Sequence, residues 1–404
     1  MESKQKLGRL ITVLATFLAF SGIGVVDPIL PIIAEKIGAS HWQVEMLFTA
    51  YILTMAIMML PAGIFASRFG DKRMMTIGLA IVTVFAFICG ISQTIAQLSL
   101  FRAGWGLGNA MFFATAMTLL IALSKEVHEA VGLYEAAIGL GMAGGPLLGG
   151  ILGGHSWRYP FFATSILIFL AFILVFFFVK EPERKVKRKA AGVGELLNLV
   201  KYKPFMQGAI SGMLYYYGFF VVLAYSPLIM HLSAIQLGFV FCGWGLALAY
   251  GSAILAHKLE GKYEPKALLK GSLLVFALFL IALFFVKIMW LQIVLIVLSG
   301  LASGLNNALF TSYVMDISPY ERSVTSGVYN FVRWLGGAIA PILSGIIGHT
   351  VSPQSPFLVG GIVVLVGCVM ILIPIRKPVE VEKKPFLKKG FSFLLQGNPF
   401  SYIC

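Results

Sequence analysis

Long apolar runs, each about twenty residues in length, alternate with short polar connections along the chain. A helix of about 20 apolar residues is long enough to cross the hydrocarbon core of a bilayer. The pattern predicts twelve membrane-spanning helices, near residues 9–34, 43–67, 74–92, 96–123, 130–154, 158–179, 205–231, 234–257, 266–287, 290–315, 323–349 and 356–376. We therefore expect an all-α polytopic membrane protein, because backbone groups in lipid must be satisfied within each helix.

The polar connections differ in charge on the two sides of the expected membrane. Of the 31 Lys and Arg residues, only Lys36, Arg158 and Lys287 lie on the side opposite the N-terminus, and Arg102 and Arg333 lie inside expected helices. By the positive-inside rule, this distribution predicts a multi-pass plasma-membrane protein with both termini in the cytoplasm. The net charge of +14 is then explained by the basic residues that gather in the cytoplasmic connections. The expected partner is the lipid bilayer, and no nucleic acid is expected.

One long connection divides the expected helices into two sets of six. The sets repeat each other, because residues 132–153 match residues 327–348, and residues 106–112 match residues 304–310. Each match joins a helix to the one six places later, which indicates two parallel six-helix bundles. The expected parts are an N-terminal bundle, a cytoplasmic linker, a C-terminal bundle and a basic cytoplasmic tail, over residues 1–179, 180–204, 205–376 and 377–404.

Glycine makes up half of the stretch 141–150, GMAGGPLLGG. Each interior glycine costs a soluble helix about 1 kcal/mol, but in a membrane small residues let helices approach closely. The repeat partner at 336–345 keeps the proline but has larger residues in place of Gly145 and Gly149. We expect kinkable helices where the halves meet, helix 5 against helix 8 and helix 11 against helix 2. We expect the two extra glycines to make the helix-5 contact the closer one.

Four motifs carry a resemblance to a known family. They are Gly141-x-x-x-Gly145-Pro146-x-x-Gly149-Gly150, Arg102-x-x-Trp105-Gly106-x-Gly108-Asn109-Ala110, Asp27-Pro28-x-x-Pro31, and Gly63-x-x-Ala66-Ser67-Arg68-x-Gly70-Asp71-Lys72-Arg73. With these motifs the chain resembles the major facilitator superfamily over residues 8–376, and more closely its twelve-helix drug:proton antiporters of the bacterial multidrug efflux type. The resemblance implies the major facilitator fold and transport by alternating access.

The loop motif departs from the family pattern. The usual acidic residue, which in the family pairs with the start of helix 11 and latches one state, is Ser67 here. Asp71 stands where a basic residue is commoner. Ser67 can cap a helix N-terminus but carries no charge. Asp71 is a candidate to replace the missing acid. The candidate conformational residues of this loop are Gly63, Ser67, Arg68, Gly70 and Asp71.

Charged residues inside a bilayer cost roughly 2.5–3.5 kcal/mol each and are candidate functional sites. Asp27 and Arg102 fall at similar depths, ~10 Å and ~8 Å from the outer side at the helical rise of 1.5 Å per residue. In the resembled fold they share a cavity wall. We expect them to pair when Asp27 is ionised and to separate when it is protonated, which makes protonation a switch. The alternative is a permanent ion pair that only orders the bundle.

Two further charged residues have open roles. Glu135, near the inner end of helix 5, is either a second proton or cation site or a neutralising group at the cytoplasmic rim. Arg333 falls near the midplane of helix 11, where the repeat position is Ile138. It either meets an anionic substrate group or pairs with Asp27 or Glu135 across the cavity, or it has a structural role.

Aromatic and amide residues in the expected helices are candidates to line a substrate cavity. Aromatic walls with few charges suit lipophilic compounds, including cations. The competing interpretation is that most such residues face lipid or pack helices. The candidate cavity residues are Asn109, Tyr216, Tyr217, Phe220, Asn307, Asn330 and Arg333.

The expected function is proton-coupled export of lipophilic drugs or toxic amphiphiles, in which a monomer binds one small lipophilic substrate. The alternative is a dedicated proton-coupled exporter of a single metabolite, such as a siderophore, a sugar or a lipid-like product. An importer and a membrane enzyme fit less well, because the helix-5 motif tracks with antiport in the resembled family and no cluster of catalytic residues is seen. No cofactor or metal is expected, since the four cysteines have no ligand spacing and no phosphate-binding loop occurs.

Overall fold

The computed structural model describes residues 2–124, 127–181, 193–260, 262–320 and 322–374. Regular structure in these ranges is entirely helical. Within the described ranges, twelve helical stretches are long and apolar enough to cross a membrane, which confirms the expected fold class. Large apolar side chains cover the outside of the bundle, such as Phe177, Phe285 and Trp290, which are 66%, 70% and 65% exposed. Such an apolar exterior is suited to lipid.

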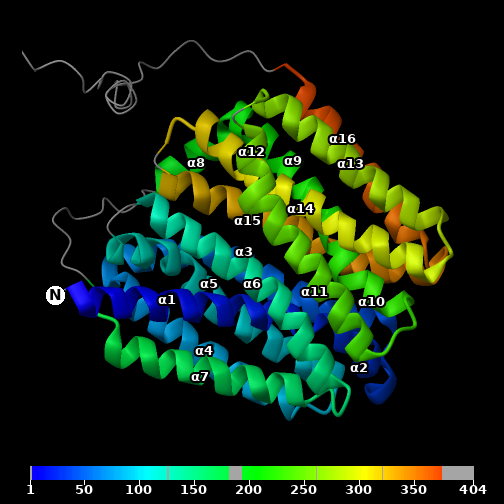
Figure 1. Cartoon of the computed structure of the whole chain (residues 1–404), viewed down its shortest axis with the longest axis horizontal. Helices are drawn as coiled ribbons and strands as arrows, with labels where there is room; N and C mark the ends of the chain where they lie inside the picture. The colour runs from blue at the N-terminus through cyan, green and yellow to red at the C-terminus, as the bar shows by residue number, and fades with distance from the viewer. Residues whose placement is uncertain (1, 125–126, 182–192, 261, 321, 375–404) are drawn as a thin grey trace, which may run out of the picture. The chain divides into compact units, whose positions relative to one another are not determined.

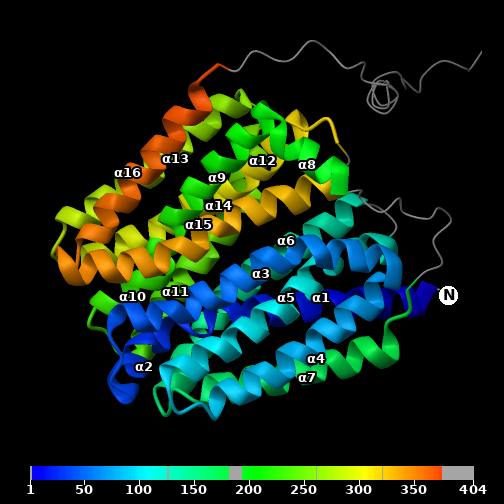
Figure 2. The same cartoon turned by 180° about the vertical axis from the view of Figure 1, so that it is seen from behind.

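The first six spans form the N-terminal half (Figures 1 and 2). It consists of α1 (Glu2–Gly24), η1 (Asp27–Ile29), α2 (Leu30–Ile37), α3 (His41–Phe69), α4 (Asp71–Gly90), α5 (Ile95–Leu123), α6 (Val127–Gly153) and α7 (Tyr159–Phe178). We call the end of the bundle where α1 begins the proximal end, and the opposite end, where α2 lies, the distal end. Successive spans run in alternating directions between these ends.

The C-terminal half begins with a short helix, α8, that forms within the expected linker, where the hydrophobic pattern predicts none. Residues 182–192 of that linker and residues 375–404, with the basic tail, lie outside the described residues. The helices of this half are α8 (Val193–Lys201), α9 (Lys203–Phe220), η2 (Val221–Tyr225), α10 (Ser226–Ile229), α11 (Ala234–Tyr250), η3 (Gly251–Leu255), α12 (Ala256–Glu260), α13 (Pro265–Phe285), α14 (Met289–Ile317), α15 (Arg322–Thr350) and α16 (Ser355–Leu372).

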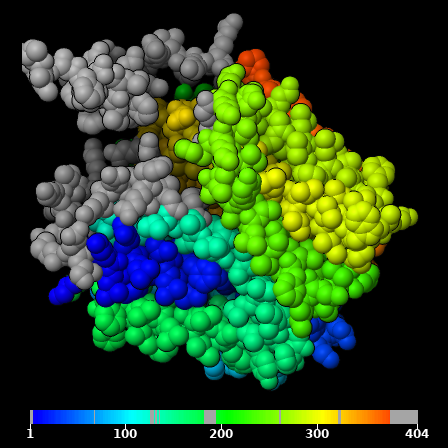
Figure 3. Space-filling view, viewed as in Figure 1, coloured from blue at the N-terminus to red at the C-terminus, as the bar shows by residue number. Residues whose placement is uncertain are grey.

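The helices pack in the same pattern in both halves. In the N-terminal half α3 packs on α5, α4 on α5 and α7, and α1 on α6; the corresponding contacts in the C-terminal half are α11 on α14, α13 on α14 and α16, and α9 on α15. Between the halves, α6 packs on α11 and α3 packs on α15. Figure 3 shows the first of these contacts in space-filling form, with side chains of α6 meeting those of α11. The expected neighbours of helices 5 and 11 are thus confirmed.

Glycines set how closely these helices approach. A Cβ on Gly150 would lie 2.5 Å from the carbonyl oxygen of Ala234 in α11, and a Cβ on Gly345 would lie 2.6 Å from the Cα of Trp42 in α3. These two repeat-related glycines therefore form the contacts between the halves.

The expected role of Gly145 and Gly149 is wrong. Any Cβ at these positions would overlap the carbonyl oxygens of Ser21 and Val25, which belong to the first span of the same half. The two glycines lie four residues apart, so they share one helix face. That face packs on α1 rather than on the other half, and the extra glycines tighten the N-terminal bundle itself.

Three of the described spans are interrupted by a change of helix type. The first span changes to a 3₁₀ turn at Asp27–Ile29, where Pro28 lacks the N–H needed to continue an α-helix. The seventh span has a π-helical segment, Val221–Tyr225, just before Pro227, and the eighth has one at Gly251–Leu255. Segments of this kind within α-helices are frequent at functional sites.

Candidate functional site

Asp27 lies at the break in the first span, as the first residue of η1, and its side chain is fully buried. A Cβ on Gly24 would lie 3.5 Å from Oδ2 of Asp27 and 2.8 Å from Cδ of Pro146 in α6. The carboxyl group therefore lies near the crossing of α1 and α6. Neither of its oxygens has a hydrogen-bond partner in the described part of the chain. Burial of an unpaired carboxylate is costly, so this arrangement fits a neutral carboxyl group.

Arg102 projects from α5 and is also fully buried. Its guanidinium carbon lies 4.3 Å from the ring centroid of Tyr51 and 4.7 Å from that of Trp105, whose rings are arranged edge to face. The amide of Asn109, two turns further along α5, donates a hydrogen bond to the Tyr51 hydroxyl. Two aromatic faces thus hold the cation, and Asn109 fixes one of them.

Asp27 and Arg102 interact electrostatically. However, no nitrogen of the guanidinium and no oxygen of the carboxyl group has a hydrogen-bond partner among the described residues. The structure thus holds the two groups apart. This is the arrangement expected for protonated Asp27, and the exchange between paired and separated forms stays a prediction.

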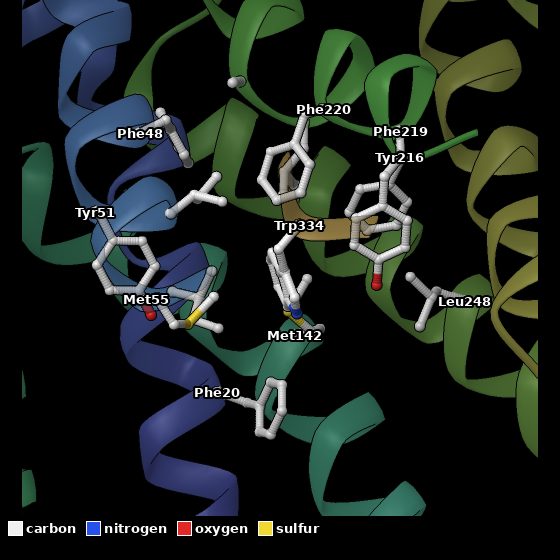
Figure 4. Packing of buried hydrophobic residues seen from close by; sticks show 14 of the residues in the cluster. Phe20, Phe48, Tyr51, Met55, Met142, Tyr216, Phe219, Phe220, Leu248 and Trp334 are labelled. Atoms are coloured by element: carbon white, nitrogen blue, oxygen red, sulfur yellow. The ribbon is translucent and has the colours of Figure 1, made fainter. Parts of the chain in front are cut away.

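The other predicted cavity residues divide into two sets. Tyr216, Phe220 and Arg333 lie together in the C-terminal half, where the guanidinium of Arg333 is 4.9 Å from the Tyr216 ring and 5.9 Å from that of Trp334. Trp334 is in turn 5.3 Å from Tyr216 and 5.9 Å from Phe220, centroid to centroid. Phe48 of α3 approaches Phe220 at 6.5 Å. Figure 4 shows this aromatic cluster, contributed by both halves.

The second set packs helices together. The Tyr215 hydroxyl lies 3.2 Å from Oδ1 of Asn307, which joins α9 to α14. Asn330 donates to the Ser326 hydroxyl within α15, and Tyr217 is buried. The side chain of Glu135 lies outside the described residues, so its role stays a prediction.

The loop between α3 and α4 shows a contact that sequence reasoning missed. Gly70 has φ +91°, a conformation that favours glycine. Directly after it, the backbone N–H groups of Asp71 and Lys72 donate to the carboxylate of Glu181, at 3.2 and 3.0 Å. A carboxylate is favoured at a helix N-terminus. Glu181 therefore caps α4 from the segment that follows α7.

The remaining residues of this motif are only partly informative. Arg68 is exposed, Asp71 is buried, and Gly63 has open space where a Cβ would lie. The side chain of Ser67 lies outside the described residues, as do those of residues 321–323 at the start of α15. The replacement of the family latch by Asp71 stays a prediction.

Sequence reasoning also missed Glu45 of α3. Its side chain is fully buried, and neither of its oxygens has a hydrogen-bond partner in the described ranges. The available signal was its isolation, because it is the sole charged residue in the stretch 43–67.

Metal chemistry finds no support in this arrangement. Within the described ranges, no group of three or more His, Cys, Asp or Glu side chains is placed to hold a metal ion. The chemistry available at the site is therefore proton binding by carboxyl groups, together with contacts of aromatic rings and guanidinium groups to an apolar molecule.

Comparison with known proteins places the fold and the site in context. The family model described as Major Facilitator Superfamily matches residues 12–341. The chain is 42% identical over 368 residues to the multidrug efflux protein YfmO of Bacillus subtilis (strain 168), covering 89% of this chain and 91% of the relative. It is 24% identical to the quinolone resistance protein NorA of Staphylococcus aureus (strain MRSA252), covering 88% and 94%.

A solved structure with the same fold is that of a bacterial homologue of the human lysosomal transporter Spinster in an inward-facing, unoccupied conformation. The TM-score is 0.71 at 18% identity, covering 91% of this chain and 94% of the other. At this level of identity the likeness concerns the fold alone.

Proposed function

Because the chain belongs to the Major Facilitator Superfamily, we propose that it is a secondary active exporter that exchanges lipophilic drugs or toxic amphiphiles for protons. The observation that carries the proposal is its 42% identity to a multidrug efflux protein over nearly the whole of both chains. The proton gradient is the proposed energy source, without an organic cofactor or metal. A monomer in the plasma membrane, with the proximal end in the cytoplasm, is the proposed working unit.

The two halves supply different parts of the proposed mechanism. Asp27 and Arg102 belong to the N-terminal half, and the ring cluster around Tyr216 and Trp334 belongs mainly to the C-terminal half. Substrate binds against the rings, because aromatic faces favour large apolar molecules. Asp27 takes up a proton from the outside, separates from Arg102 and becomes compatible with burial when the distal end closes.

The first test removes the titratable group at Asp27. In cells loaded with a panel of lipophilic dyes, Asp27→Asn is expected to abolish proton-driven efflux, because the amide cannot release a proton. Glu35→Gln is the matched control, since Glu35 is exposed at the same end of the bundle. Efflux at the wild-type rate by Asp27→Asn refutes the role of Asp27.

A protonophore tests the energy source, and the dye panel tests the substrate range. Wild-type efflux is expected to stop when the protonophore collapses the gradient, and several unrelated lipophilic compounds are expected to be exported. Export that resists the protonophore contradicts the proposed coupling. Export restricted to one metabolite favours the dedicated exporter over the multidrug carrier.

A further inference from the structure

Glu45 lies on the face of α3 that packs against the other half of the molecule. Two contacts to the C-terminal half, about two turns apart, define this face. Trp42 lies against Gly345 of α15, and the hydroxyl of Thr49 donates to the carbonyl oxygen of Ala338 at 2.6 Å. Glu45 falls between Trp42 and Thr49, at spacings of three and four residues that keep all three on one side of a helix.

The surroundings of Glu45 come from both halves. Asp27 of η1 acts on it electrostatically from its own half, and Glu45 acts in the same way on Tyr225 of η2. The Tyr225 hydroxyl donates to the carbonyl oxygen of Pro353 at 2.9 Å, at the distal end of the C-terminal half. The segment that carries Asp27 also packs on α11 of the other half. Closure of one end of the seam thus buries both carboxyl groups.

An unpaired ionised carboxylate is poorly tolerated in such a place. Both oxygens of Glu45 and both oxygens of Asp27 are buried and lack hydrogen-bond partners among the residues described. Two negative charges near each other would add repulsion to the cost of lost hydration. The closed distal end is therefore compatible with two neutral carboxyl groups, whereas its opening lets water reach both, so that both can ionise.

We propose that Glu45 is a second proton-binding site, which fills together with Asp27 when the distal end closes. One carboxylate oxygen of each residue gains a proton from the outside water on closing, and each proton leaves towards the proximal, cytoplasmic side before the distal end opens again, so that a complete cycle moves two protons. The inference rests on the proposed proton-coupled function and extends it to the number of protons exchanged.

The prediction concerns how steeply closure depends on pH. Because the closed form holds the added protons, acidification favours closing and alkalinisation favours opening. Each proton taken up changes the closing equilibrium constant by up to roughly tenfold per pH unit, so two protons give up to roughly a hundredfold. Glu45→Gln and Asp27→Asn should each reduce this slope by about one proton, and the double variant by about two.

Spin labels at residues 93 and 287 measure closure directly. Gln93 and Lys287 are exposed at the distal end, one in each half, and the full chain carries the labels in lipid nanodiscs after its cysteines are replaced by Ala. Electron spin distance measurements over a pH series then give the closed fraction. Three histidines, His41, His231 and His349, also lie at the distal rim, but they are present in every variant and cancel in the comparison.

Two further variants complete the test. Glu45→Asp keeps a titratable group and should restore the wild-type slope, whereas Glu35→Gln should leave it unchanged. A wild-type slope in Glu45→Gln overturns this inference and leaves the proposed function intact, provided that Asp27→Asn still lowers the slope. If the closed fraction of the wild type does not change with pH, both this inference and the proposed proton-coupled function are overturned.

Discussion

At the scale of single residues, the notable feature is a buried cation held by rings rather than by a carboxylate. Arg102 stacks on Tyr51 and Trp105. A cation over an aromatic face gains about 0.5–2 kcal/mol, with the larger values where water is excluded. This attraction keeps the guanidinium in place when Asp27 is neutral. In the proposed mechanism, Arg102 then remains in position to pair with Asp27 when the proton leaves.

Arg102→Lys tests whether the planar guanidinium matters beyond its charge. Lysine keeps the charge but loses the flat group that stacks on Tyr51 and Trp105, so we expect proton-driven dye efflux to fall at least about tenfold, the equivalent of about 1.4 kcal/mol. Arg158→Lys is the matched control. Arg158 also stacks on a tryptophan, Trp157, at 4.5 Å, and donates to the Gly90 carbonyl at the distal rim.

Dye uptake into everted membrane vesicles, which corresponds to efflux from intact cells, measures the effect of the Arg102 substitution, and the amount of each variant in the membrane corrects for expression. The control should transport normally. Wild-type efflux by Arg102→Lys contradicts the stacking role and leaves charge alone as the requirement.

At the scale of elements, the sequence predicted the spans well and their breaks poorly. Apolar length is a local property, so twelve runs gave twelve spans. The turns at Asp27–Ile29 and Val221–Tyr225 depend on how neighbouring helices satisfy the backbone. The rotation of a helix about its axis also depends on its neighbours. For this reason the sequence predicted that Gly145 takes part in a close helix contact but assigned that contact to the wrong helix.

Gly145→Ala tests the corrected contact. A methyl group at this position would overlap the carbonyl oxygen of Ser21, which is backbone and cannot move aside as a side chain does. Overpacking of this kind typically costs about 1–3 kcal/mol. We expect a lower thermal unfolding temperature in detergent and reduced efflux, because the strain reaches the segment that carries Asp27.

Gly144→Ala is the control for the Gly145 variant. A Cβ at Gly144 would lie 3.5 Å from ring atoms of Phe17, an ordinary contact. The two substitutions add the same methyl group one residue apart on the same helix. Equal unfolding temperatures for the two variants contradict the assignment of Gly145 to the α1 contact.

At the scale of the whole molecule, the internal repeat predicted two similar halves but not how they divide the work. The charges at Asp27 and Arg102 stood out because polar residues are rare in apolar segments. Glu45 did not, because it lies close to the start of the second apolar stretch, 43–67. Only the packing of α3 on the other half reveals that it is buried. A property that arises from two halves in contact cannot be read from either half's sequence alone.

Alternating access requires the distal contact between Trp42 and Gly345 to open in every cycle. A Cβ on Gly345 would lie 3.0 Å from the Cβ of Trp42, close to the Cβ separation of a disulfide, about 3.5–4.5 Å. The pair Trp42→Cys and Gly345→Cys should therefore form a disulfide that holds the distal end closed and stops efflux. Each single substitution serves as the control for loss of the native side chain.

The reductant then reports which side of the membrane the distal end faces. The Lys and Arg distribution predicts that it faces outward, so a membrane-impermeant reductant added to intact cells should restore efflux to the level of the single variants. If the oxidised double variant still exports dye at the level of the single variants, the contact between residues 42 and 345 does not need to open during transport. If only a membrane-permeant reductant restores efflux, the predicted orientation of the distal end is wrong. The requirement that the distal contact opens during transport is then unaffected.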